Sequence, residues 1–147
     1  MAYPKENPKE VHPMDDTLAL SLVTFFAGRP QEEALGRAVT QRLLKELPGI
    51  TVQVQKSQIT FRGRYGFAAL SLPRRAQDKA AHAVLLTLGL PARLDSPRVA
   101  VATEPYPGRW THHIPLASPQ ELDEELLGWV HAAYAFAESK GRREKSS

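Results

Sequence analysis

The sequence predicts a single α+β domain. It is expected to have two N-terminal helices, an antiparallel five- or six-stranded meander sheet, and a long C-terminal helix packed on one face of the sheet. Two patterns predict this fold. Apolar residues recur every three or four positions in 18–47 and in 122–137, as on a helix. Through most of 50–116 they alternate with polar residues instead, as on a strand.

The two N-terminal helices have recognisable ends. The first is expected to begin after Asp16, whose side chain is a good N-cap, and to end at Gly28. The second is expected to begin at Pro30, because proline suits the first turn of a helix, and to end at Pro48 and Gly49. Each has one apolar face, formed by Leu18, Leu22, Phe25 and Phe26 in the first helix and by Leu35, Val39, Leu43 and Leu47 in the second.

The alternating stretch divides into strands at turn-forming residues. Short connections between successive strands favour an antiparallel meander. Residues 82–90 are apolar in both alternating sets, which is typical of a central strand. Residues 99–103 are expected to form a short edge strand. The strands expected are 50–55, 58–62, 67–72, 82–90, 99–103 and 110–116.

The C-terminal helix is expected to begin with Ser118 as its cap and Pro119 in its first position. Glu121, three residues after Ser118, would complete a capping box. Gly141 is expected to end the helix. Its apolar face is formed by Leu122, Leu126, Val130, Ala133 and Ala137.

The composition excludes several classes of function. The chain has no cysteine, which excludes disulfides, thiolate metal ligands and cysteine nucleophiles. It shows no apolar signal-peptide region and no apolar run long enough for a membrane span, so we expect a cytoplasmic protein without membrane contact. The net charge of +3 is modest. The domain is expected over 16–140, between a flexible tail at 1–15 and a basic flexible tail at 141–147.

No sequence motif indicates a cofactor or a catalytic mechanism. His112 and His113 are adjacent on a strand and would point to opposite faces, so they cannot ligate one metal ion. The sequence contains no HExxH zinc motif, no GxSxG nucleophile motif and no glycine-rich phosphate loop. We therefore expect no metal and no cofactor, and the sequence favours a binding module over an enzyme.

The segment 104–113 is the chemically densest part of the chain, with a proline-glycine turn, two aromatic residues, an arginine and two histidines. Strand alternation places Trp110 and His112 on the core side and His113 on the open face of the sheet. We expect that face to bind a polar or anionic ligand, or a protein partner. The residues expected to contact it are Lys56, Gln58, Arg62 and His113, with Tyr106 and Arg109 at the rim.

Other roles stay open from the sequence. The open face can be an ordinary solvated surface. His113 would be the general base if the protein were an enzyme. The edge strand at 99–103 would be the contact surface if the protein formed a homodimer. A nucleic-acid accessory factor would contact phosphates through a basic rim formed by Lys56, Arg62, Arg64, Arg74, Arg75 and Lys79.

Several short segments, spread over about 17–137, together resemble a known family. They are Phe25-Phe26-Ala-Gly, Lys56-Ser-Gln-Ile-Thr-Phe-Arg62, Gly66-Phe-Ala68, the run 84–91, Asp95-Ser-Pro97, Gly108-Arg-Trp-Thr-His-His113, and the closing helix with Tyr134. In these segments the chain is similar to the DUF5655 family of bacterial and archaeal domains of unknown function. The resemblance implies an α+β fold and brings no established activity, cofactor or catalytic residue.

Overall fold

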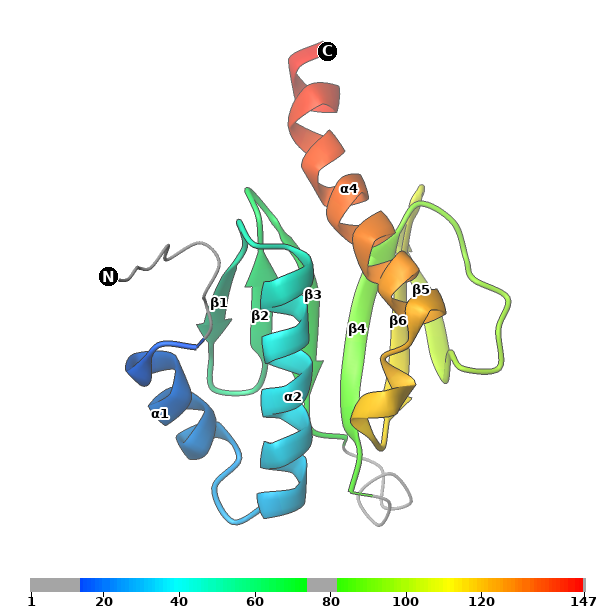
Figure 1. Ribbon diagram of the computed structural model, residues 1–147. Helices are drawn as coiled ribbons and strands as arrows, with labels where there is room; N and C mark the ends of the chain where they lie inside the picture. The colour runs from blue at the N-terminus through cyan, green and yellow to red at the C-terminus, as the bar shows by residue number, and fades with distance from the viewer. Residues whose placement is uncertain (1–13, 74–81, 147) are drawn as a thin grey trace.

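The computed structural model describes residues 14–73 and 82–146, with the backbone alone for 141–146. Most of the tail expected at 1–15, most of the loop after the third strand, and Ser147 lie outside the described residues. The described elements confirm the α+β class, the two N-terminal helices and the C-terminal helix (Figure 1). They are α1 (Asp16–Phe25), α2 (Pro30–Glu46), β1 (Thr51–Val54), β2 (Ile59–Arg62), β3 (Gly66–Ser71), β4 (Val84–Leu90), β5 (Val101–Tyr106), β6 (Arg109–Leu116), η1 (Pro119–Glu121) and α4 (Glu124–Ser146).

The six strands form one antiparallel sheet in the order β1-β2-β3-β4-β6-β5. The first four are a meander, as expected. The last two exchange places relative to a plain meander, so that β6 pairs with β4 and β5 lies at the edge. Burial explains this order. Ile114 and Leu116 of β6 are about 1% exposed, whereas most residues of β5 are exposed.

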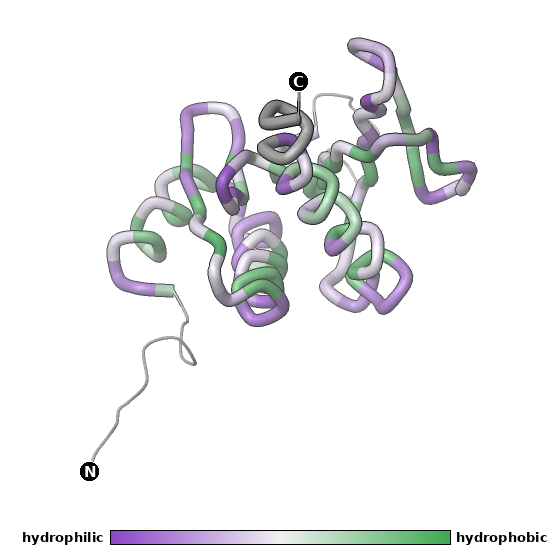
Figure 2. Tube along the Cα trace, turned by 90° about the horizontal axis from the view of Figure 1, so that it is seen from above, coloured by the Kyte–Doolittle hydropathy of each residue, from purple (hydrophilic) through white to green (hydrophobic). Residues whose placement is uncertain are grey.

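Helices α2 and α4 lie across one face of the sheet, and α1 lies beside α2, next to β1 (Figure 1). The view from above shows α2 and the start of α4 on the same side of the strands (Figure 2). The core forms between these helices and the sheet, where burial of each large apolar side chain contributes about 1.5–3 kcal/mol. The largest fully buried apolar side chains are Leu22, Phe26, Leu43, Ile59, Phe61, Leu70, Leu86, Leu88, Ile114, Leu116 and Leu126.

No described helix covers the opposite face of the sheet. Burial alternates along β2, where Ile59 and Phe61 are fully buried and Arg62 is partly exposed. His112 is 0% exposed and lies on the helix side. One row of register partners crosses the open face, formed by Thr60, Ala69, Thr87, His113 and Val101. The expected sides of His112 and His113 are therefore confirmed.

Several helix ends differ from expectation. α1 ends at Phe25, before Gly28, and α2 ends at Glu46, before Pro48 and Gly49. The N-cap of α1 is Asp15, one residue earlier than expected, and its carboxylate accepts a hydrogen bond from the Leu18 N–H at 2.8 Å. The cap expected at Ser118 is wrong, because residues 119–121 form only the short turn η1. The cap of α4 is Asp123, which accepts from the Leu126 N–H at 3.1 Å. Gly141 does not end α4, which continues to Ser146. Glycine in a helix costs only about 1 kcal/mol relative to alanine.

The largest differences at strand ends are in β4 and β5. The strand expected to begin at His82 begins at Val84, because His82 has a φ of 55°, which an extended strand does not allow. The edge strand expected at 99–103 is β5, and it runs on to Tyr106. Pro105 is tolerated within it, because proline in a sheet is found on edge strands. None of the described helices combines the length and apolar character that crossing a membrane requires.

Arg98 ties the loop before β5 to the start of α4. Its Nη1 donates to both carboxylate oxygens of Asp123, at 2.9 and 3.1 Å, and to Glu125 at 3.0 Å. Its Nη2 donates to the Glu121 carbonyl. The hydrogen bond from Arg98 lowers the pKa of Asp123. The guanidinium also lies 5.9 Å from the centre of the Trp129 ring. These contacts join the loop that leads into β5 to the helix layer.

Candidate functional site

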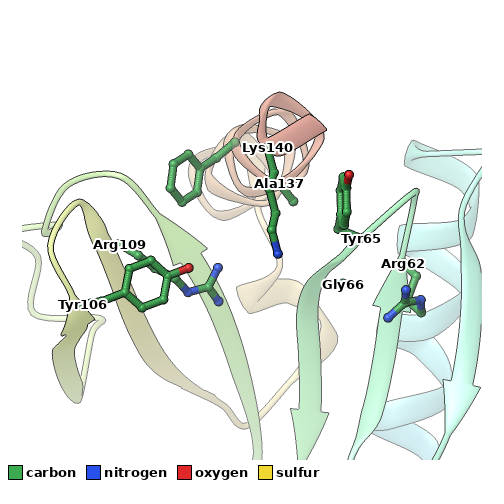
Figure 3. A pocket seen from close by; sticks show the side chains of 8 residues that line it. Arg62, Tyr65, Gly66, Tyr106, Arg109, Ala137 and Lys140 are labelled. Atoms are coloured by element: carbon green, nitrogen blue, oxygen red, sulfur yellow. The ribbon is translucent and has the colours of Figure 1, made fainter. Parts of the chain in front are cut away.

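A pocket of about 300 Å³ opens at one end of the sheet, between the turn that joins β2 to β3 and the turn that joins β5 to β6. The C-terminal half of α4 passes over it (Figure 3). Three separate parts of the chain therefore build its walls. The residues that line it are Arg62, Tyr65, Gly66, Tyr106, Arg109, Phe136, Ala137 and Lys140.

Three positive charges reach this pocket, and no acidic residue is among those that line it. Arg62 comes from the end of β2, Arg109 from the start of β6, and Lys140 from α4. In Figure 3, Arg109 and Lys140 point towards the middle of the pocket, and Arg62 lies on the side opposite Arg109. Among the described side chains, none of the three cations forms an ion pair with a carboxylate. The pocket is therefore a positively charged site without an internal counter-charge.

Gly89 of β4 lies directly against the guanidinium group of Arg109. A Cβ at position 89 would lie 2.6 Å from Cζ and Nη2 of Arg109 and 2.7 Å from Nη1. These distances are shorter than van der Waals contact, so only glycine leaves room for the guanidinium where it lies. The bare backbone of β4 thus lets the head group of Arg109 rest against the sheet. This contact fixes one of the three cations.

Two tyrosines flank the pocket, one on each turn. Tyr65 follows β2, and the ammonium group of Lys140 lies 5.1 Å from the centre of its ring, a cation–π distance. Tyr106 ends β5 and is 57% exposed, which makes it one of three exposed large apolar side chains among the described residues. Figure 3 shows the Tyr106 hydroxyl directed towards the middle of the pocket. The site therefore combines cations with aromatic walls and phenolic donors.

The turn between β2 and β3 is attached to α4, which makes this side of the pocket rigid. The Arg64 N–H donates to Oε2 of Glu138 at 2.8 Å. A Cβ at Gly63 would lie 2.7 Å from Oε2 of Glu138 and 2.7 Å from the Tyr134 ring, so the turn and the helix are in close contact. The ring of Phe67 meets that of Tyr134 edge to face, with centres 5.3 Å apart.

The turn between β5 and β6 is fixed by its own residues. Gly108 has a φ of 84°, which glycine adopts without strain. Its N–H donates to the carboxylate of Glu104 at 3.2 Å. The register between β5 and β6 shifts between Thr103 and Tyr106, and Tyr106 then pairs with Arg109. The proline-glycine sequence thus places a tyrosine and an arginine side by side at the pocket.

The structure brings together three of the six residues expected to bind a ligand, namely Arg62, Tyr106 and Arg109. Lys56 lies in the turn that joins β1 to β2, whereas Arg62 lies at the opposite end of β2. It lines a different depression, with residues of α1. Gln58, near Lys56, donates to the Thr60 hydroxyl at 2.9 Å.

His113 lies on the open face and does not line the pocket. Its Nδ1 is 3.0 Å from the hydroxyl of Thr87, its register partner on β4. Burial lowers the pKa of His113. A lowered pKa keeps the imidazole neutral at pH 7. The observed role of His113 is therefore a cross-strand contact with Thr87.

His112 is a core residue. Its Nε2 accepts a hydrogen bond from the Leu94 N–H at 3.0 Å, so Nδ1 carries the proton of the neutral ring. Nδ1 has no partner of normal hydrogen-bond geometry in the described part of the chain. Burial lowers the pKa of His112. The Leu88 backbone opposes this effect in part, and the charges of Arg93 and His113 lower the pKa by smaller amounts.

Lys140 and Tyr65 were not among the expected site residues. Lys140 is the last residue of the domain expected from the sequence, and no local pattern relates it to Tyr65. Only the packing of α4 on the sheet brings these two residues together. The described residues contain no group of three or more histidine, aspartate or glutamate side chains placed to hold a metal ion.

A comparison with protein-family models matches residues 25–137 to a domain of unknown function, DUF5655. This span contains every residue that lines the pocket except Lys140. Searches of the curated proteins and of the solved structures give no significant match.

Proposed function

The chain belongs to the DUF5655 family, and we propose that it is a binding module whose pocket between the β2–β3 and β5–β6 turns holds an anionic ligand. One observation carries the proposal. Arg62, Arg109 and Lys140 come from three separate elements and reach one pocket that has no acidic lining residue.

Gathering like charges has a cost that an anion removes. Two positive charges a few ångströms apart repel by about 1 kcal/mol in bulk water and by several times more at a partly buried site. Arginine and lysine bind phosphate and carboxylate oxygens through charge-assisted hydrogen bonds, which are stronger than neutral ones. Tyr65 and Tyr106 add phenolic groups that can donate to the same oxygens. The pocket is therefore suited to an anion with several oxygens.

The other roles considered from the sequence receive less support. The basic residues expected to contact nucleic acid do not form one continuous surface. Lys56 lies in the turn before β2 and Arg62 lies at the far end of β2, and residues 74–81 lie outside the described part. His113 does not line the pocket, so a general-base role is not part of the proposal. The β5 edge carries Pro105 and a register shift, features that protect an edge strand from pairing. The cytoplasmic location expected from the sequence belongs to the proposal as well.

The proposal is tested by calorimetric titration with inorganic pyrophosphate, a small polyanion. In a parallel unfolding measurement, pyrophosphate at a hundred times its Kd is expected to add about 2.7 kcal/mol to the free energy of unfolding. Arg62→Ala, Arg109→Ala and Lys140→Ala are each expected to weaken binding by about tenfold or more, because each removes a charge-assisted hydrogen bond. Lys56→Ala is the matched control, since it removes a cation outside the pocket and is expected to leave Kd unchanged. Equal losses in Lys56→Ala and Arg109→Ala would rule the pocket out.

A further inference from the structure

We infer that the ligand of this pocket is a nucleoside phosphate, with its phosphate oxygens held by Arg62, Arg109 and Lys140 and its base stacked on Tyr106. The inference rests on the proposed function and adds the chemical class of the ligand. Three features carry it: the size of the pocket, the number of cations that line it, and the position of its two tyrosines.

The pocket is too large for a bare inorganic anion. Its volume of about 300 Å³ is at the lower end of the range typical of small-molecule sites, roughly 300–1,000 Å³. A single water molecule occupies about 30 Å³ in the liquid, and a phosphate ion has only five non-hydrogen atoms. A phosphate alone would leave much of this space unfilled. A ligand the size of a mononucleotide fits better.

The charge of the lining favours phosphate over a single carboxylate. Arg62, Arg109 and Lys140 present three formal positive charges. One carboxylate would neutralise one of them and leave the other two repelling each other. A phosphate monoester carries between one and two negative charges at pH 7 and has three terminal oxygens, so it can accept hydrogen bonds from all three groups at once.

The surroundings of the two tyrosines indicate which of them stacks on the base of the ligand. The Tyr65 ring already faces the ammonium group of Lys140 at 5.1 Å. Tyr106 is 57% exposed, and no other aromatic ring of the described residues stacks on it. Tyr106 also lies beside Arg109, its register partner. A ligand whose phosphate meets Arg109 would therefore bring an attached ring system close to Tyr106.

A mononucleotide is favoured over a nucleic-acid strand, because a strand needs a row of cations along its backbone. The described cations near the pocket line one small pocket instead. Lys56, at the far end of β2, does not extend that site.

The test compares adenosine 5′-monophosphate, ribose 5-phosphate, adenosine and pyrophosphate by calorimetric titration of the full chain. Adenosine 5′-monophosphate is expected to bind about tenfold more tightly than ribose 5-phosphate, because stacking of the base on an aromatic side chain increases affinity by about that factor. Tyr106→Leu is expected to reduce the affinity for the nucleotide to that for ribose 5-phosphate, and Tyr106→Phe to retain the difference. Uridine and guanosine monophosphates measure which base is preferred.

The outcomes separate this inference from the proposed function. Binding of pyrophosphate with no gain from the base would overturn the nucleotide assignment and leave the anion site standing. Unchanged nucleotide affinity in Tyr106→Leu would do the same. No binding of any phosphate compound would overturn both. A 5′-phosphorylated pentanucleotide that binds much more tightly than the mononucleotide would replace the inference with a nucleic-acid site.

Discussion

The guanidinium group of Arg109 occupies the space that a side chain at Gly89 would fill, since a Cβ there would lie 2.6 Å from Arg109 Cζ. Gly89 is on β4 and Arg109 is at the start of β6, the strand paired with it. The absence of one methyl group on the sheet therefore sets the position of a cation in the pocket. This relationship provides the most selective test of the anion site.

Gly89→Ala is expected to weaken pyrophosphate binding by about tenfold, the effect of losing one charge-assisted hydrogen bond. The new methyl group meets the flexible end of Arg109, so the guanidinium moves while the strand stays in place. The free energy of unfolding is expected to change by less than about 1 kcal/mol. Titration and thermal unfolding of the same variant measure the two effects. Gly49→Ala is the control, because a Cβ at position 49 would have no neighbour within 4 Å. Full affinity in Gly89→Ala would show that Arg109 does not hold the anion.

Adjacent residues of β2 are expected to respond in opposite ways. Phe61 is 0% exposed in the core, and Phe61→Ala is expected to cost about 3–5 kcal/mol of stability because it leaves a cavity. Arg62 lies on the other side of the strand. Arg62→Ala is expected to change stability by less than about 0.5 kcal/mol and to weaken anion binding by about tenfold or more. Denaturant unfolding and titration of both variants check the pair. A large loss of stability in Arg62→Ala would contradict the assigned face.

The protein is expected to lose stability in mild acid because of the two histidines on β6, His112 and His113. Burial lowers the pKa of both His112 and His113 in the folded state. The unfolded chain then binds protons first, below about pH 6.5, so the free energy of unfolding is constant above that value and falls as the pH decreases from it. One such group contributes a slope of at most about 1.4 kcal/mol per pH unit.

His112→Gln is expected to flatten this pH dependence, because glutamine keeps an acceptor for the Leu94 N–H and does not titrate. Unfolding measured at several values between pH 5 and pH 8 checks it, with His113→Gln as the parallel variant. A pH profile that neither substitution changes would mean that other groups dominate.

Replacement of two glycines by alanine is expected to change the free energy of unfolding in opposite directions. A Cβ at Gly63 would lie 2.7 Å from both Glu138 Oε2 and Tyr134 Cε1, so Gly63→Ala is expected to separate the turn from α4 and to cost roughly 1–3 kcal/mol. A Cβ at Gly128, on the exposed side of α4, would have no neighbour within 4 Å. Gly128→Ala is expected to stabilise the protein by up to about 1 kcal/mol, through helix propensity. Thermal unfolding ranks the two variants, and a stabilising Gly63→Ala would contradict the close contact between the turn and α4.

Local patterns predicted the helices, the strands and the sides on which their residues lie. Phe61 and His112 turn inward and His113 turns outward because the period of a strand is two, whatever the order of the strands. The ends of the helices were less predictable, because several residues near each end could form the cap. Asp123 caps α4 in place of Ser118, and α4 passes through Gly141, since a cap or a break is decided by contacts outside the local sequence.

The sequence by itself determined the α+β class, that the core lies on one side of each strand, and that Arg62 lies on the side of its strand away from that core. Only the tertiary structure decided that Arg62 and Arg109 meet at one end of the sheet while Lys56 lies at the other, and that Tyr65 and Lys140 join them. The reason is distance along the chain. A repeating sequence pattern shows only on which face of its own helix or strand a residue lies. The pocket depends instead on the strand order β4-β6-β5 and on where α4 crosses the sheet, and both result from packing between elements far apart in the sequence.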